Sequence, residues 1–277
     1  MTPQTLVTAT AVRLGPTLGD PSGNLARSIA AIEGAARGGA ALIVLPELVT
    51  SGYSFEGEGE ARTLAETIPG PASDGWAAAA ARLGVVIVGG ICEVDPEGRL
   101  RNSAVVVDAD GTVLCVYRKI HLWGIEKAIF EEGDEPPPVV ETAVGRLGVG
   151  ICYDLWFPEL ARSLALRGAQ ILAYPSNLSL STHQDGMPHL EIVVPVATAH
   201  LNRVNLVVAD RCTAERGNQW LGAALVVDAD GILLDGPPAG DGPSSATGTF
   251  DVARADDKGW AAFNDILADR RPGTYQP

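Results

Sequence analysis

The sequence predicts an α/β protein, because short apolar runs alternate along it with stretches of helical periodicity. Four runs bounded by glycine or proline are typical of buried strands, and they cover residues 41–47, 84–91, 146–152 and 169–177. Three stretches carry apolar residues at three-to-four spacing, end at a glycine and are typical of helices: residues 24–40, 73–84 and 158–168. This alternation indicates helices packed on a sheet.

Two segments resemble each other: SAVVVDADGTVL at residues 103–114 and AALVVDADGILL at 223–234. Each is a β-rich run, an Asp-Gly turn and a second β-rich run, which predicts a hairpin. The repeat indicates either two related halves or a chance match between common turns. No low-complexity linker divides the chain, so a single domain over residues 1–277 is expected. The stretch 235–248, rich in Pro, Gly and Ser, is expected to be an exposed loop before a last strand and a tail.

Composition narrows the classes of function. Hydrophobic residues make up 46% and charged residues 19% of the 277 residues, which is enough apolar material for a large core. A net charge of −14 lacks the positive field that nucleic acids or anionic membranes require, so a small-molecule partner is expected. The N-terminus has no basic segment followed by a long apolar run, which predicts a cytoplasmic protein. The four cysteines have no CxxC spacing and are expected to be free thiols rather than zinc ligands.

Polar residues follow three predicted strands: Glu47 after ALIVLP, Lys119 after TVLCVYR and Cys152 after RLGVGI. Pro158 suits the first turn of a helix, so Cys152 lies on a short link between a strand and a helix. A thiol that attacks a carbonyl needs a base, and a nearby cation stabilises the oxyanion. Taken singly, the three residues also suit a buried structural thiol, a solvated carboxylate and a surface cation.

Three blocks around these residues together resemble the nitrilase superfamily of carbon–nitrogen hydrolases. They read LPELVTSGY at residues 45–53, YRKIHLWGIEKAIFEEGD at 117–134 and GICYDLWFPELAR at 150–162. The resemblance covers nearly the whole chain and implies a four-layer α-β-β-α sandwich that forms homodimers or higher homo-oligomers. It also places a tail, about 252–277, where it can pack on a partner subunit. One departure is Val12, at a position in the first strand where many relatives have glutamine.

The resemblance assigns roles to five residues of this sequence. It implies that Glu47 is the general base and later the acid, that Lys119 stabilises the oxyanion, and that Cys152 is the nucleophile. The backbone N–H of Tyr153 is the second oxyanion donor, and Glu126 positions the substrate and buttresses the triad. The substrate pocket is expected to contain Tyr53, Trp123, Tyr153, Trp156, Asn177 and His183. For the two tryptophans the alternative is packing in the core, and for His183 it is a loop position outside the site.

The implied activity is hydrolysis of a small amide through a thioester, with release of ammonia and a carboxylic acid. Protein groups and water suffice for it, so neither a metal nor an organic cofactor is expected. The motif CYDLWFPE favours the amidase-like or carbamoyl-amine-hydrolase-like branch of the superfamily. The alternatives are N-carbamoyl amine hydrolysis and nitrile hydrolysis with the same triad. Two further readings remain: a papain-like hydrolase that pairs Cys152 with His121, His183 or His189, and a binding or scaffolding subunit that has kept the fold.

Overall fold

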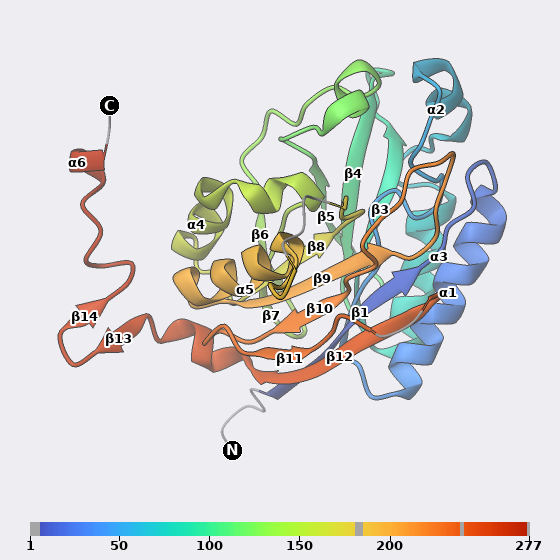
Figure 1. The fold of residues 1–277 in the computed structure, drawn as a ribbon. Helices are drawn as coiled ribbons and strands as arrows, with labels where there is room; N and C mark the ends of the chain where they lie inside the picture. The colour runs from blue at the N-terminus through green and yellow to red at the C-terminus, as the bar shows by residue number, and fades with distance from the viewer. Residues whose placement is uncertain (1–5, 181–184, 239–240, 276–277) are drawn as a thin grey trace.

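Two six-stranded half-sheets form the centre of the protein, which is described by a computed structural model over residues 6–180, 185–238 and 241–275 (Figure 1). They meet in a short parallel pairing of Arg13 with Asp210 and Leu14 with Arg211. The first half contains β12 (Ser244–Asp251), β1 (Leu6–Leu14), β2 (Leu42–Val44), β3 (Val86–Val94), β4 (Leu100–Val107) and β5 (Val113–Arg118). The second contains β6 (Val139–Thr142), β7 (Gly145–Val149), β8 (Ile171–Pro175), β9 (Asn205–Arg211), β10 (Leu225–Val227) and β11 (Leu233–Asp235).

The two halves have the same strand order and direction. In the first, β1, β2 and β3 are parallel, β12 flanks β1 antiparallel, and β3, β4 and β5 run as an antiparallel meander. In the second, β7, β8 and β9 are parallel, β6 flanks β7 antiparallel, and β9, β10 and β11 run as the meander. The two predicted hairpins are therefore confirmed as β4–β5 and β10–β11. Their equivalent places favour two related halves over a chance match.

Side-chain alternation along the strands separates an inner core from an outer one. Leu42 and Val44 of β2 belong to the cluster that joins both half-sheets, whereas Ile43 between them belongs to a second cluster beneath α1 and α3. Val12 lies in this outer cluster at 3% exposure, so an apolar residue suits its place in β1. The helices cover the outer faces and complete four α-β-β-α layers (Figure 1): α1 (Pro21–Arg37) and α3 (Pro71–Leu83) on one side, α4 (Pro158–Leu166) and α5 (Leu190–Asn202) on the other.

The predicted helices are present with shifted ends. Helix α1 begins three residues before the expected position because Asp20 caps it, accepting a hydrogen bond from the amide of Gly23. Helix α3 ends where Gly84 takes a left-handed conformation, with a φ of 69°. Helix α4 has Pro158 in its first turn, as predicted. The short elements are α2 (Glu58–Leu64), η1 (Gly124–Ala128), η2 (Cys152–Trp156), η3 (Val252–Asp256), β13 (Gly259–Ala261), β14 (Asn264–Asp265) and α6 (Pro272–Tyr275).

The C-terminal segment leaves the body of the molecule after β12. Figure 1 shows β13, β14 and α6 extending beyond the helices α4 and α5. Phe263 is 94% exposed, and Trp260 and Tyr275 are also exposed. Across the described ranges, no helix combines the length and the apolar character needed to cross a membrane.

Candidate active site

Three buried polar residues follow the carboxyl ends of strands. Glu47 lies three residues after β2, Lys119 directly after β5, and Cys152 three residues after β7. Their exposed fractions are 0%, 1% and 9%. Because ionisable side chains are seldom buried without partners, their burial at one end of the strands points to a shared site.

Lys119 links two carboxylates from distant parts of the chain. Its Nζ lies 2.6 Å from Oε1 of Glu47 and 2.9 Å from each carboxylate oxygen of Glu126. The hydroxyl of Tyr53 donates to Oε1 of Glu126 at 2.5 Å, and the amide of Trp123 donates to Oε2 at 3.2 Å. Glu126 is 2% exposed and is held by three donors, which fixes the ammonium group between the two acids.

Burial and the charges within this cluster shift its pKa values. Burial raises the pKa of Glu47 to about 7, although Lys119 opposes this rise. Burial alone lowers the pKa of Lys119, but Glu47 and then Glu126 outweigh it and raise that pKa above its ordinary value. Burial and the charge of Glu47 raise the pKa of the Cys152 thiol well above its usual range. The thiol is therefore protonated at neutral pH, whereas the carboxyl group of Glu47 changes its protonation state near neutrality.

Cys152 occupies a strained turn. Its φ of 44° lies in the left-handed region, which residues with a side chain seldom adopt. Its Sγ lies 3.5 Å from the carbonyl oxygen of Asn177. Asp154 fixes the turn, because its Oδ2 accepts from the amide of Ile151 at 2.9 Å and from the hydroxyl of Tyr117 at 2.7 Å. These bonds hold the thiol at the exit of β7.

The loop that carries Glu47 packs directly on β3. Leu48 in this loop has a φ of 46°, and Gly90 is the residue of β3 at the contact. A Cβ on Gly90 would lie 2.6 Å from the amide nitrogen of Leu48 and 2.7 Å from Cα of Glu47. Only glycine admits this approach, so Gly90 allows the backbone at Glu47 to lie directly against β3.

A cavity of about 320 Å³ opens onto Cys152. Four of the six predicted pocket residues line it: Trp123, Tyr153, Trp156 and Asn177. The two tryptophans are 46% and 38% exposed, which does not fit the core-packing alternative. Tyr53 is not among the lining residues; its hydroxyl donates to Glu126. His183 lies outside the described residues.

The structure adds site residues that the sequence reasoning missed. Leu178, Ser179 and Glu191 also line the cavity, and Asn102 donates to Oε1 of Glu47 at 2.7 Å. Glu191 is 2% exposed in the first turn of α5, where an acid also suits the helix dipole. Asn102 lies inside a strand next to the predicted 103–114 hairpin, and no local pattern separates it from other strand asparagines.

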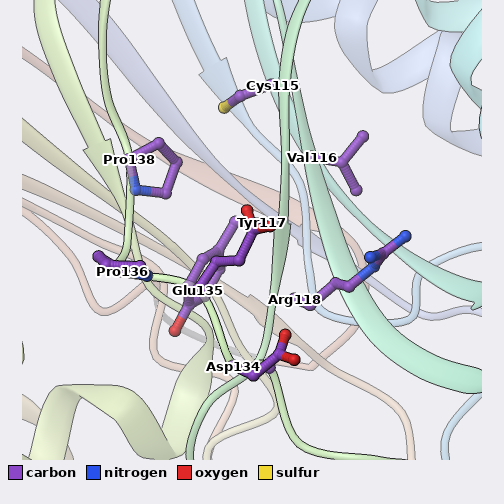
Figure 2. Close-up of a pocket in the computed structure, with 9 residues that line it drawn as sticks. Cys115, Val116, Tyr117, Arg118, Asp134, Glu135, Pro136 and Pro138 are labelled. Carbon is purple, nitrogen blue, oxygen red and sulfur yellow. The ribbon is translucent and has the colours of Figure 1, made fainter.

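A second cavity, of about 180 Å³, lies elsewhere along the edge strand β5 (Figure 2). Its walls come from β5 and from the loop 133–138. Cys115 lines it, and burial raises the pKa of that thiol to about 11, so the thiol is neutral at physiological pH. Glu47, Lys119 and Cys152 do not line this cavity. Among the residues with described positions, no group of three or more His, Cys, Asp or Glu side chains could hold a metal ion.

Comparison with known proteins decides the family. The family model described as carbon-nitrogen hydrolase matches residues 8–256. The chain belongs to the carbon–nitrogen hydrolase family. As a whole it is similar to a nitrilase of Pyrococcus abyssi, with 36% identity over 265 residues that cover 95% of this chain and 97% of the relative. It is 32% identical over 290 residues to an N-carbamoylputrescine amidase of Solanum lycopersicum, with 98% and 94% covered.

Solved structures of the nitrilase superfamily agree with this carbon–nitrogen hydrolase fold. A carbon–nitrogen hydrolase from Helicobacter pylori G27 superposes with a TM-score of 0.85 at 26% identity, covering 98% of this chain and 97% of the other. A mutant of the amidase from Nesterenkonia AN1 gives a TM-score of 0.77 at 27% identity, covering 97% and 95%. The resemblance to the nitrilase superfamily is therefore confirmed, and the papain-like alternative is excluded. His121 instead binds Asp154, with its Nδ1 2.7 Å from Oδ1.

Proposed function

We propose that this carbon–nitrogen hydrolase cleaves the C–N bond of a small linear amide, with Cys152 as nucleophile, Glu47 as general base and Lys119 as oxyanion donor. One observation carries the proposal: the buried ammonium of Lys119 lies 2.6 Å from Glu47 and 2.9 Å from Glu126, beside a cavity that opens onto Cys152. A cation, a base and a thiol in one desolvated site are the groups that acyl transfer needs.

Acylation begins when substrate fills the cavity. Glu47 takes the thiol proton as the sulfur of Cys152 forms a bond to the carbonyl carbon, and the C=O electron pair moves onto oxygen. The ammonium of Lys119 and the backbone N–H of Tyr153 hold this oxyanion. When the pair returns, the C–N bond breaks and the nitrogen leaves as ammonia with the proton from Glu47.

Deacylation reverses these roles. Water gives a proton to Glu47 and attacks the thioester carbon, and the C–S bond then breaks with return of that proton to the sulfur of Cys152. The products are a carboxylic acid and the free enzyme, so protein groups and water balance the cycle. Glu126 holds Lys119 in place throughout, and Tyr53 holds Glu126.

The relatives support an amide as the substrate class. In one solved structure of a mutant of the Nesterenkonia amidase, the acetamide moiety of fluoroacetamide is covalently attached at the active-site cysteine. The motif Cys-Tyr-Asp at Cys152, followed by Phe-Pro-Glu, favours the amidase-like branch. Trp123 and Trp156 at the rim offer apolar surface to the rest of a small substrate.

One observation favours a second candidate, an N-carbamoyl amine. Glu191 puts a buried carboxyl group in the cavity wall, and its oxygens can accept a hydrogen bond from the additional N–H that a carbamoyl amine has and a simple amide lacks. Hydrolysis of such a compound consumes one water and yields the amine, ammonia and carbon dioxide. In this case Glu191→Gln raises KM for a carbamoyl amine and leaves KM for a neutral amide unchanged.

The test is ammonia release from a panel of linear amides, N-carbamoyl amines and nitriles, measured for the wild type and for two cysteine variants. Cys152→Ala is expected to abolish release. Cys92→Ala is the matched control, because Cys92 is also buried but its Sγ contacts the backbone of Ala61. Equal rates for Cys152→Ala and the wild type would contradict the proposal, and the absence of turnover across the panel would favour a binding or scaffolding subunit.

The tail supports a homodimer as the working assembly. Phe263, Trp260 and Tyr275 are exposed on a segment that extends past the body (Figure 1), and Leu201 of α5, also exposed, lines the same cavity as Trp260 and Tyr275. Exposed aromatic residues grouped on one segment suit contact with a second copy of the chain. Removal of the tail after residue 256 is expected to lower the mass measured by light scattering to that of a monomer, whereas an unchanged mass would contradict this role.

The four free cysteines fit a cytoplasmic location.

A further inference from the structure

The two carboxylate oxygens of Glu47 have different surroundings. Oε1 accepts from Nζ of Lys119 at 2.6 Å and from Nδ2 of Asn102 at 2.7 Å. Oε2 is buried and has no hydrogen-bond partner among the described residues. Since Glu47 is fully buried, Oε2 is not open to bulk solvent. One oxygen is thus saturated with donors while the other is left available to take a proton.

Asn102 forms hydrogen bonds with both Glu47 and Lys119. Its side chain, on a residue 1% exposed, donates to Glu47, and its backbone oxygen accepts from the amide of Lys119 at 2.8 Å. The pairing of β4 with β3 and β5 fixes the backbone on both sides. Asn102, on a strand paired on both sides, therefore fixes both the rotation of the Glu47 carboxylate and the backbone position from which the Lys119 side chain extends.

We propose that Asn102 is a positioning residue: with Lys119 it binds Oε1 of Glu47 and so leaves Oε2 as the single oxygen that exchanges protons with the Cys152 thiol, the leaving nitrogen and the attacking water. This inference rests on the proposed function of the triad. Two donors that meet at one oxygen prevent the carboxylate from rotating, because rotation would break both hydrogen bonds. A fixed acceptor is what proton transfer in both half-reactions needs.

The charges around Glu47 give the proposal a measurable signature. Hydrogen bonds from Lys119 and Asn102 stabilise the ionised form and lower its pKa, against the larger upward effect of burial. Loss of the Asn102 donor therefore raises the pKa of Glu47. The titratable groups that act on Glu47 from the surrounding elements are Lys119 after β5, Glu126 on η1, Cys152 on η2 and Tyr53 after β2.

The experiment is a pH profile of kcat/KM for Asn102→Leu, which keeps the side-chain volume and removes the donor. The acid limb, which reports Glu47 in the free enzyme, is expected to move upward by about one pH unit. We expect kcat to fall on the order of 10–100-fold and KM to change less than about threefold, since the variant misplaces a reacting group. Asn102→Asp, the closest in shape, raises the limb further because a second carboxyl opposes ionisation of Glu47.

Ser103→Ala is the matched control. Ser103 follows Asn102 on β4 and also donates to a buried glutamate, but that partner is Glu93. The control is expected to lose stability while its acid limb stays at the wild-type pH. If both Asn102 variants keep the wild-type limb, or lose activity only in proportion to stability as Ser103→Ala does, Asn102 is structural and the proposal is overturned. Failure of the proposed function is distinguishable, because Cys152→Ala would then retain wild-type turnover.

Discussion

Replacement of Lys119 by methionine tests the electrostatics of the site most severely. The change keeps much of the side-chain volume but removes an ammonium with a 2.6 Å contact to Glu47 and two 2.9 Å contacts to Glu126. Two buried carboxylates then face each other without a cation. Because both cannot ionise in that environment, the folded variant holds one additional proton well above neutral pH.

The size of the stability change in Lys119→Met follows from the linkage between proton binding and folding. The unfolded chain ionises both acids above about pH 4.5, so a proton held only by the folded state makes stability fall as pH rises, by about 1.4 kcal/mol per pH unit. The wild type is a suitable reference above pH 7.5, where Glu47, with a pKa of about 7, is largely ionised. Between pH 7.5 and 9, Lys119→Met is expected to lose about 2 kcal/mol more of its unfolding free energy than the wild type does.

Denaturant unfolding at several pH values measures this slope, and an ammonia assay measures the activity. We expect kcat/KM to fall on the order of 10³-fold, because an oxyanion donor and the ionised base are lost together. Lys127→Met is the matched control, since Lys127 is an exposed lysine beside Glu126 on η1. A Lys119→Met variant with the wild-type slope and more than a tenth of wild-type activity would contradict these roles of the Lys119 ammonium.

Three other outcomes are expected. First, kcat/KM rises as pH increases through about 7, because Glu47 must be ionised to act as the base; a flat profile from pH 5.5 to 8 would contradict this assignment. Second, Gly90→Ala displaces the Glu47 loop and lowers kcat/KM on the order of 10²-fold, whereas Gly34→Ala in α1, with its nearest atom at 3.9 Å, leaves activity unchanged; equal effects in steady-state assays would contradict the packing argument. Third, Trp156→Ala raises KM with little change in kcat, and a selective loss of kcat would show that the ring acts elsewhere.

Local sequence patterns predicted the elements that carry strong signals. The Asp-Gly turns marked both hairpins, and Pro158 marked the start of α4. Helix α5 was missed, because Pro195 interrupts its interior and proline ordinarily ends a helix. Strand β9, NLVVADR, was missed because its buried polar ends obscure a short apolar run.

The site shows a similar division. Sequence blocks pointed to Glu47, Lys119, Cys152 and Glu126, and the structure brings their side chains into one cluster with hydrogen bonds that link three of them. Asn102 could not be predicted, because its role depends on which side of β4 faces the loop after β2. That information lies in strand pairing between distant segments and not in any local pattern.

Intact-mass analysis of the acyl-enzyme tests whether Cys152 forms a thioester with the substrate. The wild type is mixed with an amide that turns over, quenched in acid within the first turnovers, and compared with Cys152→Ala. The wild type is expected to gain the mass of the acyl group on the peptide containing Cys152, and Cys152→Ala is expected to gain none. An acyl group on Cys152→Ala, or wild-type turnover without any acyl-enzyme on Cys152, would contradict the thioester mechanism.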